Sequence, residues 1–406
     1  MALEWFMKFD NLKNKILVLG NYRQTLAVVR SLALFGFDVV LGCTDKKDPT
    51  VYSKFCKKTW RHSSIEDDAP NFISELKIFI NNEKINYIFP VGEIEIILLS
   101  QNIDFISPNV AIVIANLDAL TICMDKFAMN SLAFQMGLPV PVFKRVKDFQ
   151  ALVSEIEMIG YPCVVKPNDS LKSLFRKKAV ILENKNDLKN KIELWPVDHP
   201  FLLIQKYISG LRNNCNFASI DGKIMAYLEV KVLRTDRYDG TGYGIFNRSV
   251  APTKVLENYC EKLVHQLNYT GVGCIQFIDN PNGFYFLEFN PRLDANCAFP
   301  FQLGYNFPAM AVQCRDHQLM PFKNPYAIGK KMHWTMGDLK GLFYELAKGE
   351  IDLIKTTIWF GKLLKTFFSS QYHLTWWWKD PCPTLFIYFK IVLTMLKRIK
   401  QFFLKS

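Results

Sequence analysis

The feature that most constrains this chain is a hairpin-like stretch at residues 271–293, GVGCIQFIDNPNGFYFLEFNPRL. Two runs with strand-like patterning flank a turn signal at residues 280–283, which predicts an antiparallel pair. Because side chains alternate between the two faces of a strand, Glu288 and Asn290 share one face, and their apolar neighbours point the other way. On the paired strand, Gln276 can face the same side as Glu288.

Three oxygen-bearing side chains on one face of a sheet can hold a divalent cation beside phosphate oxygens. Gln276, Glu288 and Asn290 are therefore candidate metal ligands. Arg292 follows within two residues, and a guanidinium can bind a phosphoryl group through two parallel hydrogen bonds. The solvent-facing side of an ordinary amphipathic hairpin would give the same pattern, so the residues alone leave both interpretations open.

Two further strands carry groups suited to a nucleotide. Lys166 lies among apolar residues in YPCVVKP, and a buried unpaired ammonium is costly, so a phosphate partner is expected. A lysine that reaches the surface along its own stem is the alternative. The segment FLLIQKYI can supply the apolar contact, backbone donor and backbone acceptor that adenine needs. Tyr207 and Ile208 could equally be core residues.

The run Gln-x(11)-Glu-x-Asn-x-Arg resembles the metal-binding segment of the ATP-grasp superfamily, to which biotin carboxylase and the large subunit of carbamoyl-phosphate synthetase belong. MDKFAMNSLAFQMGLPVPVF is similar to the family's entry helix, where a basic residue, here Lys126, contacts ATP phosphates. YPCVVKP is similar to the strand that carries the phosphate-binding lysine, here Lys166. FLLIQKYISG is similar to the adenine-binding strand, and its matching residues are Gln205, Lys206, Tyr207 and Ile208.

The resemblance extends over residues 16–322 and implies an α/β architecture. A Rossmann-like pre-ATP-grasp domain is expected at 1–115 and a two-subdomain ATP-grasp fold at 116–325, with the adenine cleft near 200–210. A basic, aromatic region with amphipathic helices follows at 326–406. The implied activity is that of a ligase that uses ATP and Mg²⁺ (or Mn²⁺) to convert a carboxylate into an acylphosphate, which an amine or a thiol then attacks. The short, carbamoyl-phosphate-synthetase-like members are the most similar.

Two departures from the family pattern leave a second, non-catalytic function open. The phosphate loop, defined here as residues 168–180, contains no glycine, although family members carry a glycine-rich loop there. Its side chains could contact phosphate instead, and the candidates are Ser170, Lys172, Ser173 and Arg176. Gln276 stands where many members have Glu or Asp, and an amide oxygen is a weaker ligand for a hard cation. A non-catalytic ATP-binding or membrane-associated scaffold is therefore the alternative function.

Two arginines are further candidates for the catalytic site. Arg234 and Arg248 flank a glycine-containing stretch, and in a grasp-type site they would face the phosphates and the acceptor. The alternative is a mobile hairpin tip with charged shoulders.

The N-terminal part alternates short apolar strands with helices between residues 15 and 115. This order predicts a parallel, doubly wound sheet. The loop after the first strand, GNYRQT, lacks the GxGxxG fingerprint, so a dinucleotide site is not expected there.

The net charge is +12, and residues 351–406 carry seven of these twelve charges, with eight Lys and one Arg against two Asp. Aromatic residues crowd the same region, which favours an anionic membrane surface over nucleic acid as its partner. Residues 385–403 have an amphipathic helical pattern, and Trp376 to Trp378 suit the headgroup level. Packing of this tail on the protein itself or in a homodimer is the alternative.

The ten cysteines are scattered and form no CxxC pair. Most lie in apolar runs, which indicates buried free thiols and a reducing cytoplasm. No signal peptide and no stretch of roughly 20 apolar residues is expected. The predicted location is the cytoplasm, at the inner face of a membrane if the tail binds lipid.

Overall fold

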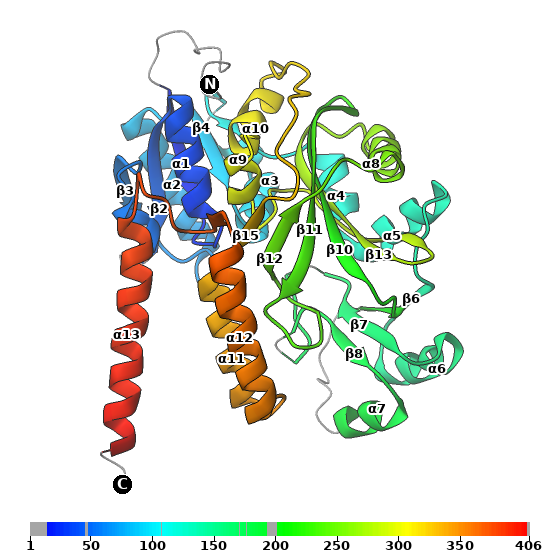
Figure 1. Cartoon of the computed structure of the whole chain (residues 1–406). Helices are drawn as coiled ribbons and strands as arrows, with labels where there is room; N and C mark the ends of the chain where they lie inside the picture. The colour runs from blue at the N-terminus through cyan, green and yellow to red at the C-terminus, as the bar shows by residue number, and fades with distance from the viewer. Residues whose placement is uncertain are drawn as a thin grey trace. The chain divides into compact units, whose positions relative to one another are not determined.

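The structure is a computed structural model that describes residues 14–44, 48–106, 108–169, 171–175, 177–192 and 201–403. The chain forms two compact units (Figure 1). Unit 1 combines Met1–Ile114, Ala295–Ala309 and His373–Ser406, and unit 2 combines Ala115–Asp294 and Met310–Tyr372. The C-terminal region is thus shared between the two units, a division that the sequence did not predict.

Unit 1 contains a five-stranded sheet in the order β3-β2-β1-β4-β5. All neighbours in this sheet are parallel, as the alternating pattern predicted. The strands are β1 (Lys15–Leu19), β2 (Asp38–Cys43), β3 (Lys58–Arg61), β4 (Tyr87–Pro90) and β5 (Ala111–Ile112). This strand order is typical of one half of a doubly wound fold. The Rossmann-like assignment itself stays a prediction.

Three long helices connect these strands: α1 (Thr25–Phe35), α2 (Ala69–Glu83) and α3 (Glu93–Gln101). Helix α1 ends where Gly36 adopts φ +114°, a left-handed conformation that suits glycine. The apolar sides of α2, α3 and the sheet form one core around Leu17, Phe72 and Leu76.

Unit 1 also includes α9 (Ala298–Gln302) and α13 (Cys382–Phe403). The stretch before α13 is attached to α1 by a buried ion pair, in which Arg30 Nε lies 2.9 Å from Asp380 Oδ2. Ser53 and the backbone N–H of Lys54 donate to the same carboxylate. Removing either partner of such a pair would leave an uncompensated buried charge.

Unit 2 begins with α4 (Leu117–Met124) and α5 (Lys126–Gln135) and contains a four-stranded antiparallel sheet in the order β6-β9-β7-β8. Its strands are β6 (Phe143–Val146), β7 (Cys163–Pro167), β8 (Val180–Leu182) and β9 (Leu202–Lys206). Helices α6 (Phe149–Ile159) and α7 (Lys185–Ile192) accompany this sheet. Together they enclose a separate small core that includes Leu152, Val165 and Ile204.

The second sheet of unit 2 has seven strands in the order β14-β13-β10-β11-β12-β15-β16. These are β10 (Leu211–Ile220), β11 (Lys223–Thr235), β12 (Gly244–Ser249), β13 (Gly271–Asn280), β14 (Gly283–Asn290), β15 (Lys331–His333) and β16 (Tyr372–His373). The pairing of β13 with β14 confirms the hairpin predicted from the alternation at 271–293.

Four helices complete the chain: α8 (Lys254–Gln266), α10 (Phe307–Arg315), α11 (Thr335–Ala347) and α12 (Leu353–Ser369). Helix α8 packs against β10 and β11, and α11 packs against α12. Within the described parts of the chain, no helix is both long enough and apolar enough to cross a bilayer.

Candidate functional site

The predicted polar face of the hairpin is present on the seven-stranded sheet. Gln276 of β13 pairs with Glu288 of β14 on one side and with Asn214 of β10 on the other. Directly paired residues project from the same face, so these three side chains form a row. The opposite face is apolar, with Phe289 in ring contact with Phe217. The sheet thus presents a polar row backed by an aromatic core.

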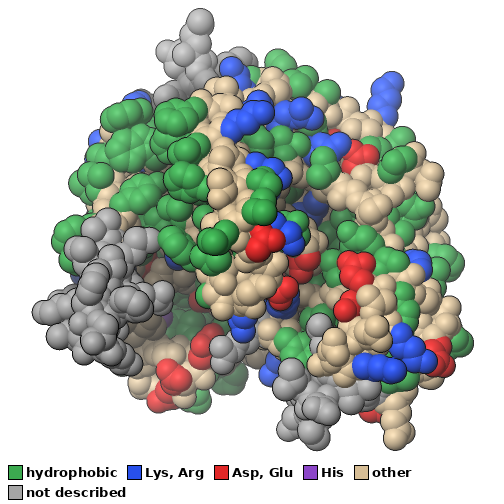
Figure 2. All heavy atoms as spheres, turned by 60° about the horizontal axis from the view of Figure 1, so that its bottom comes forward, with side chains coloured by type: hydrophobic (Ala, Val, Ile, Leu, Met, Phe, Trp, Pro, Cys, Tyr) green, Lys and Arg blue, Asp and Glu red, His purple; other side chains and the backbone are tan. Residues whose placement is uncertain are grey.

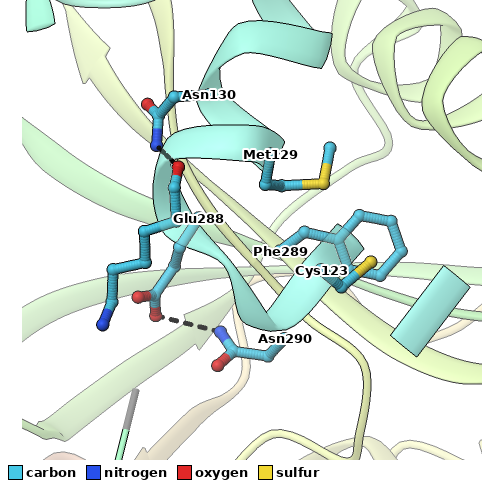
Figure 3. Close-up of a pocket in the computed structure, with 7 residues that line it drawn as sticks. Cys123, Met129, Asn130, Glu288, Phe289 and Asn290 are labelled. Carbon is cyan, nitrogen blue, oxygen red and sulfur yellow. Dashed lines mark hydrogen bonds between the residues drawn. The ribbon is translucent and has the colours of Figure 1, made fainter. Parts of the chain in front are cut away.

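Glu288 and Asn290 lie together on this face (Figure 3). Asn290 Nδ2 donates to Glu288 Oε1 at 2.9 Å, so the Asn290 amide turns its nitrogen toward the carboxylate. The second Asn290 group, Oδ1, is therefore the atom that can accept a hydrogen bond or ligate a cation. Both residues line a pocket together with Cys123, Lys126, Met129, Asn130 and Phe289.

Gln276 carries an unsatisfied acceptor. Its side chain is only 6% exposed, and its Oε1 is buried without a hydrogen-bond partner among the described residues. A buried unpaired acceptor costs free energy unless a donor or a cation reaches it. Mg²⁺ fits that requirement, because Oε1 of Gln276 and the carboxylate of Glu288 leave adjacent paired strands on one face.

The ligand set contains a single carboxylate. Over the ranges that the structure describes, no three His, Cys, Asp or Glu side chains gather into a metal site. A cation at Gln276, Glu288 and Asn290 would thus need further oxygen ligands from phosphate or water. This matches the way Mg²⁺ is held beside nucleotides rather than in a cage of protein carboxylates.

Lys126 is the first residue of α5, directly after Asp125, whose side chain caps the helix by accepting from the Ala128 N–H at 2.9 Å. The Lys126 ammonium donates to the carbonyl of Pro167 at 2.9 Å. This bond joins the start of α5 to the end of β7, at the beginning of the phosphate loop. Lys126 thereby lines the pocket beside Glu288.

Lys166 projects from β7 and is only 5% exposed. Burial lowers the pKa of its ammonium to about 8, although the nearby Glu288 carboxylate acts in the opposite direction and Lys126 adds to the lowering. Burial alone would raise the pKa of Glu288, but the charge of Lys166 and the hydrogen bond from Asn290 hold it below its usual range. Lys166 on the four-stranded sheet and Glu288 on the seven-stranded sheet are therefore close enough for each charge to shift the pKa of the other.

Arg212 is a further candidate site residue, which the sequence did not indicate. It lies two residues before Asn214 on β10, and so on the same face of the sheet as Gln276. Its charge contributes to the lowered pKa of Glu288. Its Nε is buried without a partner among the described residues, while Nη1 donates to the carbonyl of Gly242 at 3.2 Å. The sequence could show only that Arg212 and Asn214 share one face of a strand. It could not show that this strand pairs with β13.

The adenine-binding candidates lie at the end of β9 and just after it. Gln205 is buried, and its Nε2 donates to Asn130 Oδ1 at 2.9 Å, which connects β9 to α5. The backbone N–H groups of Lys206 and Tyr207 donate to Val142 and Pro162. Because these two N–H groups are already used, a backbone hydrogen bond to adenine would have to come from another residue of the segment. The next N–H along the chain is that of Ile208.

The phosphate loop contains no glycine, and the buried side chain of Leu174 fixes it to the core of the four-stranded sheet. Leu174 is 1% exposed and belongs to the core of the four-stranded sheet. Its backbone exchanges two hydrogen bonds with Lys177, whose ammonium lies 3.6 Å from Asp239 at the β11–β12 turn. Lys172 and Ser173 are exposed. Ser170 and Arg176, also predicted to contact phosphate, lie outside the described residues.

Arg234, one of the three predicted catalytic arginines, is bound by a carboxylate outside this group. Arg234 Nη1 donates to Asp338 Oδ1 at 2.6 Å, and the same carboxylate binds His333 and the Trp359 indole. Burial alone would raise the pKa of Asp338, but these hydrogen bonds hold it below its usual range. Arg234 is therefore occupied by a contact between β11 and α11.

Arg248 points to the other face of the sheet. Asn247 pairs with Val232, which pairs with Arg212, so Asn247 shares the face of Arg212. Arg248, the next residue, projects oppositely and pairs with Lys231. Arg292 follows β14, and its Nη1 donates to the Leu293 carbonyl at 3.1 Å. The catalytic roles of the three arginines stay predictions.

Comparison with known proteins identifies the family of one segment and the fold of the chain. Residues 123–296 match the family model of the ATP-grasp domain. This segment is an ATP-grasp domain. It contains α5, the four-stranded sheet and the β13–β14 hairpin, and the resemblance inferred from the four motifs is confirmed.

Among curated proteins, this chain is similar over part of its length to D-alanine–D-alanine ligase of Thermoanaerobacter sp. (strain X514). The two are 26% identical over 183 residues, which cover 41% of this chain and 50% of the ligase. The ligase of Thermoanaerobacter pseudethanolicus matches to the same extent. The chain thus spans about half the length of the curated relatives it matches.

Solved structures agree in fold. A biotin carboxylase–beta-gamma-ATP complex from Campylobacter jejuni has a TM-score of 0.62 at 15% identity, covering 78% of this chain and 74% of that one. An N5-carboxyaminoimidazole synthetase from Staphylococcus aureus has a TM-score of 0.60 at 16% identity, covering 80% and 83%. The biotin carboxylase domain of a Hydrogenobacter thermophilus 2-oxoglutarate carboxylase, a dimer with MgADP and bicarbonate, has a TM-score of 0.64 at 14% identity, covering 79% and 74%. At these identities the likeness shows the fold alone.

Proposed function

We propose that this chain is an ATP- and Mg²⁺-dependent ligase that activates a carboxylate as an acylphosphate for attack by an amine or a thiol. One observation carries the proposal: the Glu288 carboxylate lies next to the unsatisfied Gln276 oxygen and is influenced by the charges of Lys166, Lys126 and Arg212. Against the carboxylates of Glu288 and of Asp294, whose Oδ2 accepts from Asn214 Nδ2 at 3.0 Å, these three cations leave one positive charge, which suits a polyphosphate.

The residues can divide the work as follows. Lys126 and Lys166 neutralise the phosphate oxygens, and both are held in place, Lys126 by the Pro167 carbonyl and Lys166 by burial. When bound at Gln276, Glu288 and Asn290, Mg²⁺ (or Mn²⁺) would supply further charge neutralisation on those oxygens. Arg212, and Arg292 as the sequence predicts, would stabilise the transferring phosphoryl group. Such a reaction depends on positioning and electrostatics and needs no covalent nucleophile of the protein.

The substrates are proposed by class. The carboxylate oxygen would attack the γ-phosphorus, the bond to the β–γ bridging oxygen would break, and ADP would leave. The amine or thiol would then attack the acyl carbon and release inorganic phosphate. The similar D-alanine–D-alanine ligases join two small molecules, which supports a carboxylate and an amine as the pair in this chain too.

A second candidate function is nucleotide binding without turnover. The observation that favours it is the phosphate loop, in which Leu174 is fixed in a core and no glycine allows the backbone to wrap around phosphates. Gln276 in place of a carboxylate also weakens the metal site. In this case the chain would be an ATP-binding or membrane-associated scaffold.

One experiment separates the two functions. ADP release is measured with Mg²⁺ over a panel of carboxylates, each with and without amines and thiols, for wild type and for Glu288→Gln. The matched control is Glu261→Gln, an exposed position on α8. Turnover that requires Glu288 but not Glu261 supports the ligase. Tight ATP binding with no turnover across the whole panel favours the scaffold.

We also propose that the chain works in the cytoplasm and that its basic C-terminal region contacts the inner face of a membrane. The support is the concentration of lysines and aromatic residues after residue 350. The alternative is a homodimer in which this region packs on a second copy. In the predicted amphipathic helix, the side chains of Val392 and of residues 394–403 lie outside the described residues.

A further inference from the structure

The outward side of α12 is apolar although it faces solvent. Four side chains show this, with exposed fractions of 80% for Leu353, 73% for Ile354, 43% for Leu364 and 80% for Phe368. A surface helix normally turns polar residues outward. Figure 2 shows that hydrophobic side chains also gather over a broad area of the face that it draws. Contiguous exposed apolar surface of this kind marks interaction sites.

The apolar stripe is fixed by how the helix is anchored. Leu353, Leu364 and Phe368 are spaced by eleven and four residues, which places them on one side of an α-helix. Trp359 and Leu363 occupy the other side and are buried. The Trp359 indole donates to the buried Asp338 carboxylate at 2.6 Å, which holds the rotation of α12 against α11. The exposed stripe cannot turn inward without breaking this bond.

The charges of α12 indicate what covers the stripe. Between Leu353 and Ser369 the helix contains three lysines and no acidic residue. Lys365 is exposed and lies beside Phe368, three residues further along the helix, and Lys362 is exposed farther round the helix from the stripe. Lys355 lies over the ring of Tyr238, with 5.0 Å between Nζ and the ring centroid. An apolar stripe with a lysine edge is complementary to the interface of an anionic bilayer.

We propose that α12 lies along an anionic membrane surface, with Leu353, Leu364 and Phe368 inserted below the headgroups, Lys365 among the headgroups, and Lys362 adding positive charge on the exposed part of the helix. Pairing of the same face in two copies would bring equal charges together, which is unfavourable. The inference specifies the membrane contact proposed above and is independent of the ligase chemistry.

The test is flotation of the full chain with two kinds of vesicle, phosphatidylcholine alone and phosphatidylcholine with phosphatidylglycerol. Two variants probe the two halves of the surface, Leu364→Ser/Phe368→Ser and Lys362→Glu/Lys365→Glu. The matched controls are Met158→Ser, 70% exposed on α6, and Lys254→Glu/Lys262→Glu, exposed on α8. Circular dichroism and thermal unfolding establish that each variant is folded.

We expect wild type to float with anionic vesicles and not with neutral ones. Each α12 variant should lower the vesicle-bound to free ratio by about tenfold or more, and the controls should float like wild type. ADP release without vesicles should be unchanged in the α12 variants. This assay tests the ligase proposal, and flotation tests the membrane contact, so the failure of one can be told from the failure of the other. Flotation of the α12 variants equal to wild type, or no flotation of wild type, overturns the inference. A wild-type dimer in solution that the α12 variants dissociate also overturns it, because a second copy would then cover the stripe.

Discussion

Replacement of Lys166 by Met should stabilise the unliganded protein at neutral pH and weaken ATP binding. Burial at 5% exposure lowers the pKa of Lys166 from 10.5 to about 8. At about 1.4 kcal/mol per pKa unit, keeping this ammonium charged in the folded state costs roughly 3 kcal/mol. Met has a similar length and no charge to desolvate, so Lys166→Met should recover most of that free energy.

The pH dependence of this effect has a definite sign. The pKa of Lys166 is lower in the folded state than in the unfolded state, so between about pH 8 and pH 10.5 the unfolded chain binds more protons. The free energy of unfolding of wild type therefore rises through this window. The advantage of Lys166→Met is complete below pH 8 and disappears as the pH approaches 10.5.

Urea unfolding of wild type and Lys166→Met between pH 7 and pH 10 measures this difference, and Lys254→Met on the exposed side of α8 is the control. The same variants are titrated with Mg·ATP by calorimetry, where loss of a charged hydrogen bond to phosphate should weaken binding by about ten- to a hundredfold. A Lys166→Met variant that is less stable than wild type at pH 7 would refute the reasoning. A stability difference that does not change with pH would refute it as well.

Three further substitutions test neighbouring contacts. Arg212→Gln should weaken Mg·ATP binding by about tenfold with little change in thermal stability, and Arg212→Lys should retain part of the affinity. Equal affinity in wild type and both variants would remove Arg212 from the site. Asp239→Asn breaks the 3.6 Å ion pair with Lys177. It should raise the KM for ATP by about two- to fivefold and change the free energy of unfolding by less than about 1 kcal/mol. An unchanged KM would show that this pair does not hold the phosphate loop. Arg234→Gln leaves the Asp338 carboxylate buried without its cation and should lower the free energy of unfolding by about 3 kcal/mol, as urea titration reports. Loss of ATP affinity without loss of stability would instead place Arg234 in the catalytic site.

Residues within one hairpin could be placed from the sequence. Gln276, Glu288 and Asn290 lie on two strands joined by a short turn, so alternation within each strand was enough to put them on one face. The lysines of the ATP-grasp motifs were found because each stands inside a recognisable segment. The parallel sheet of unit 1 was predictable for the same reason, since each strand–helix unit is local.

Residues that depend on long-range pairing could not be placed in this way. Register shifts in β11 between Val232 and Arg234, and between Arg234 and Thr235, break the simple alternation, so the face of Arg234 cannot be counted from its neighbours. Arg212 joins the site only because β10 pairs with β13, which is distant in the sequence. The partner of Arg234, Asp338, comes from a helix about a hundred residues later.

The C-terminal helices show a different limit. Amphipathic spacing predicted a helix at residues 385–403, within α13, but the sequence could not say which side of α12 or α13 would be covered. In α12 the buried side is set by Trp359 and its bond to Asp338, and as a result Leu353 and Phe368 face outward. Only the tertiary contact between Trp359 and Asp338 shows which apolar side of α12 is buried and which is exposed to solvent.

Calorimetric titration of Mg·ATP into wild type, Glu288→Gln and the control Glu261→Gln tests the central claim most directly. The account predicts saturable binding to wild type and to Glu261→Gln. For Glu288→Gln it predicts at least about tenfold weaker binding that no longer depends on Mg²⁺, because the only carboxylate in the ligand set is gone. No binding to wild type, or binding to Glu288→Gln that matches wild type in affinity and in Mg²⁺ dependence, would contradict the assignment of ATP and Mg²⁺ to this face of the sheet.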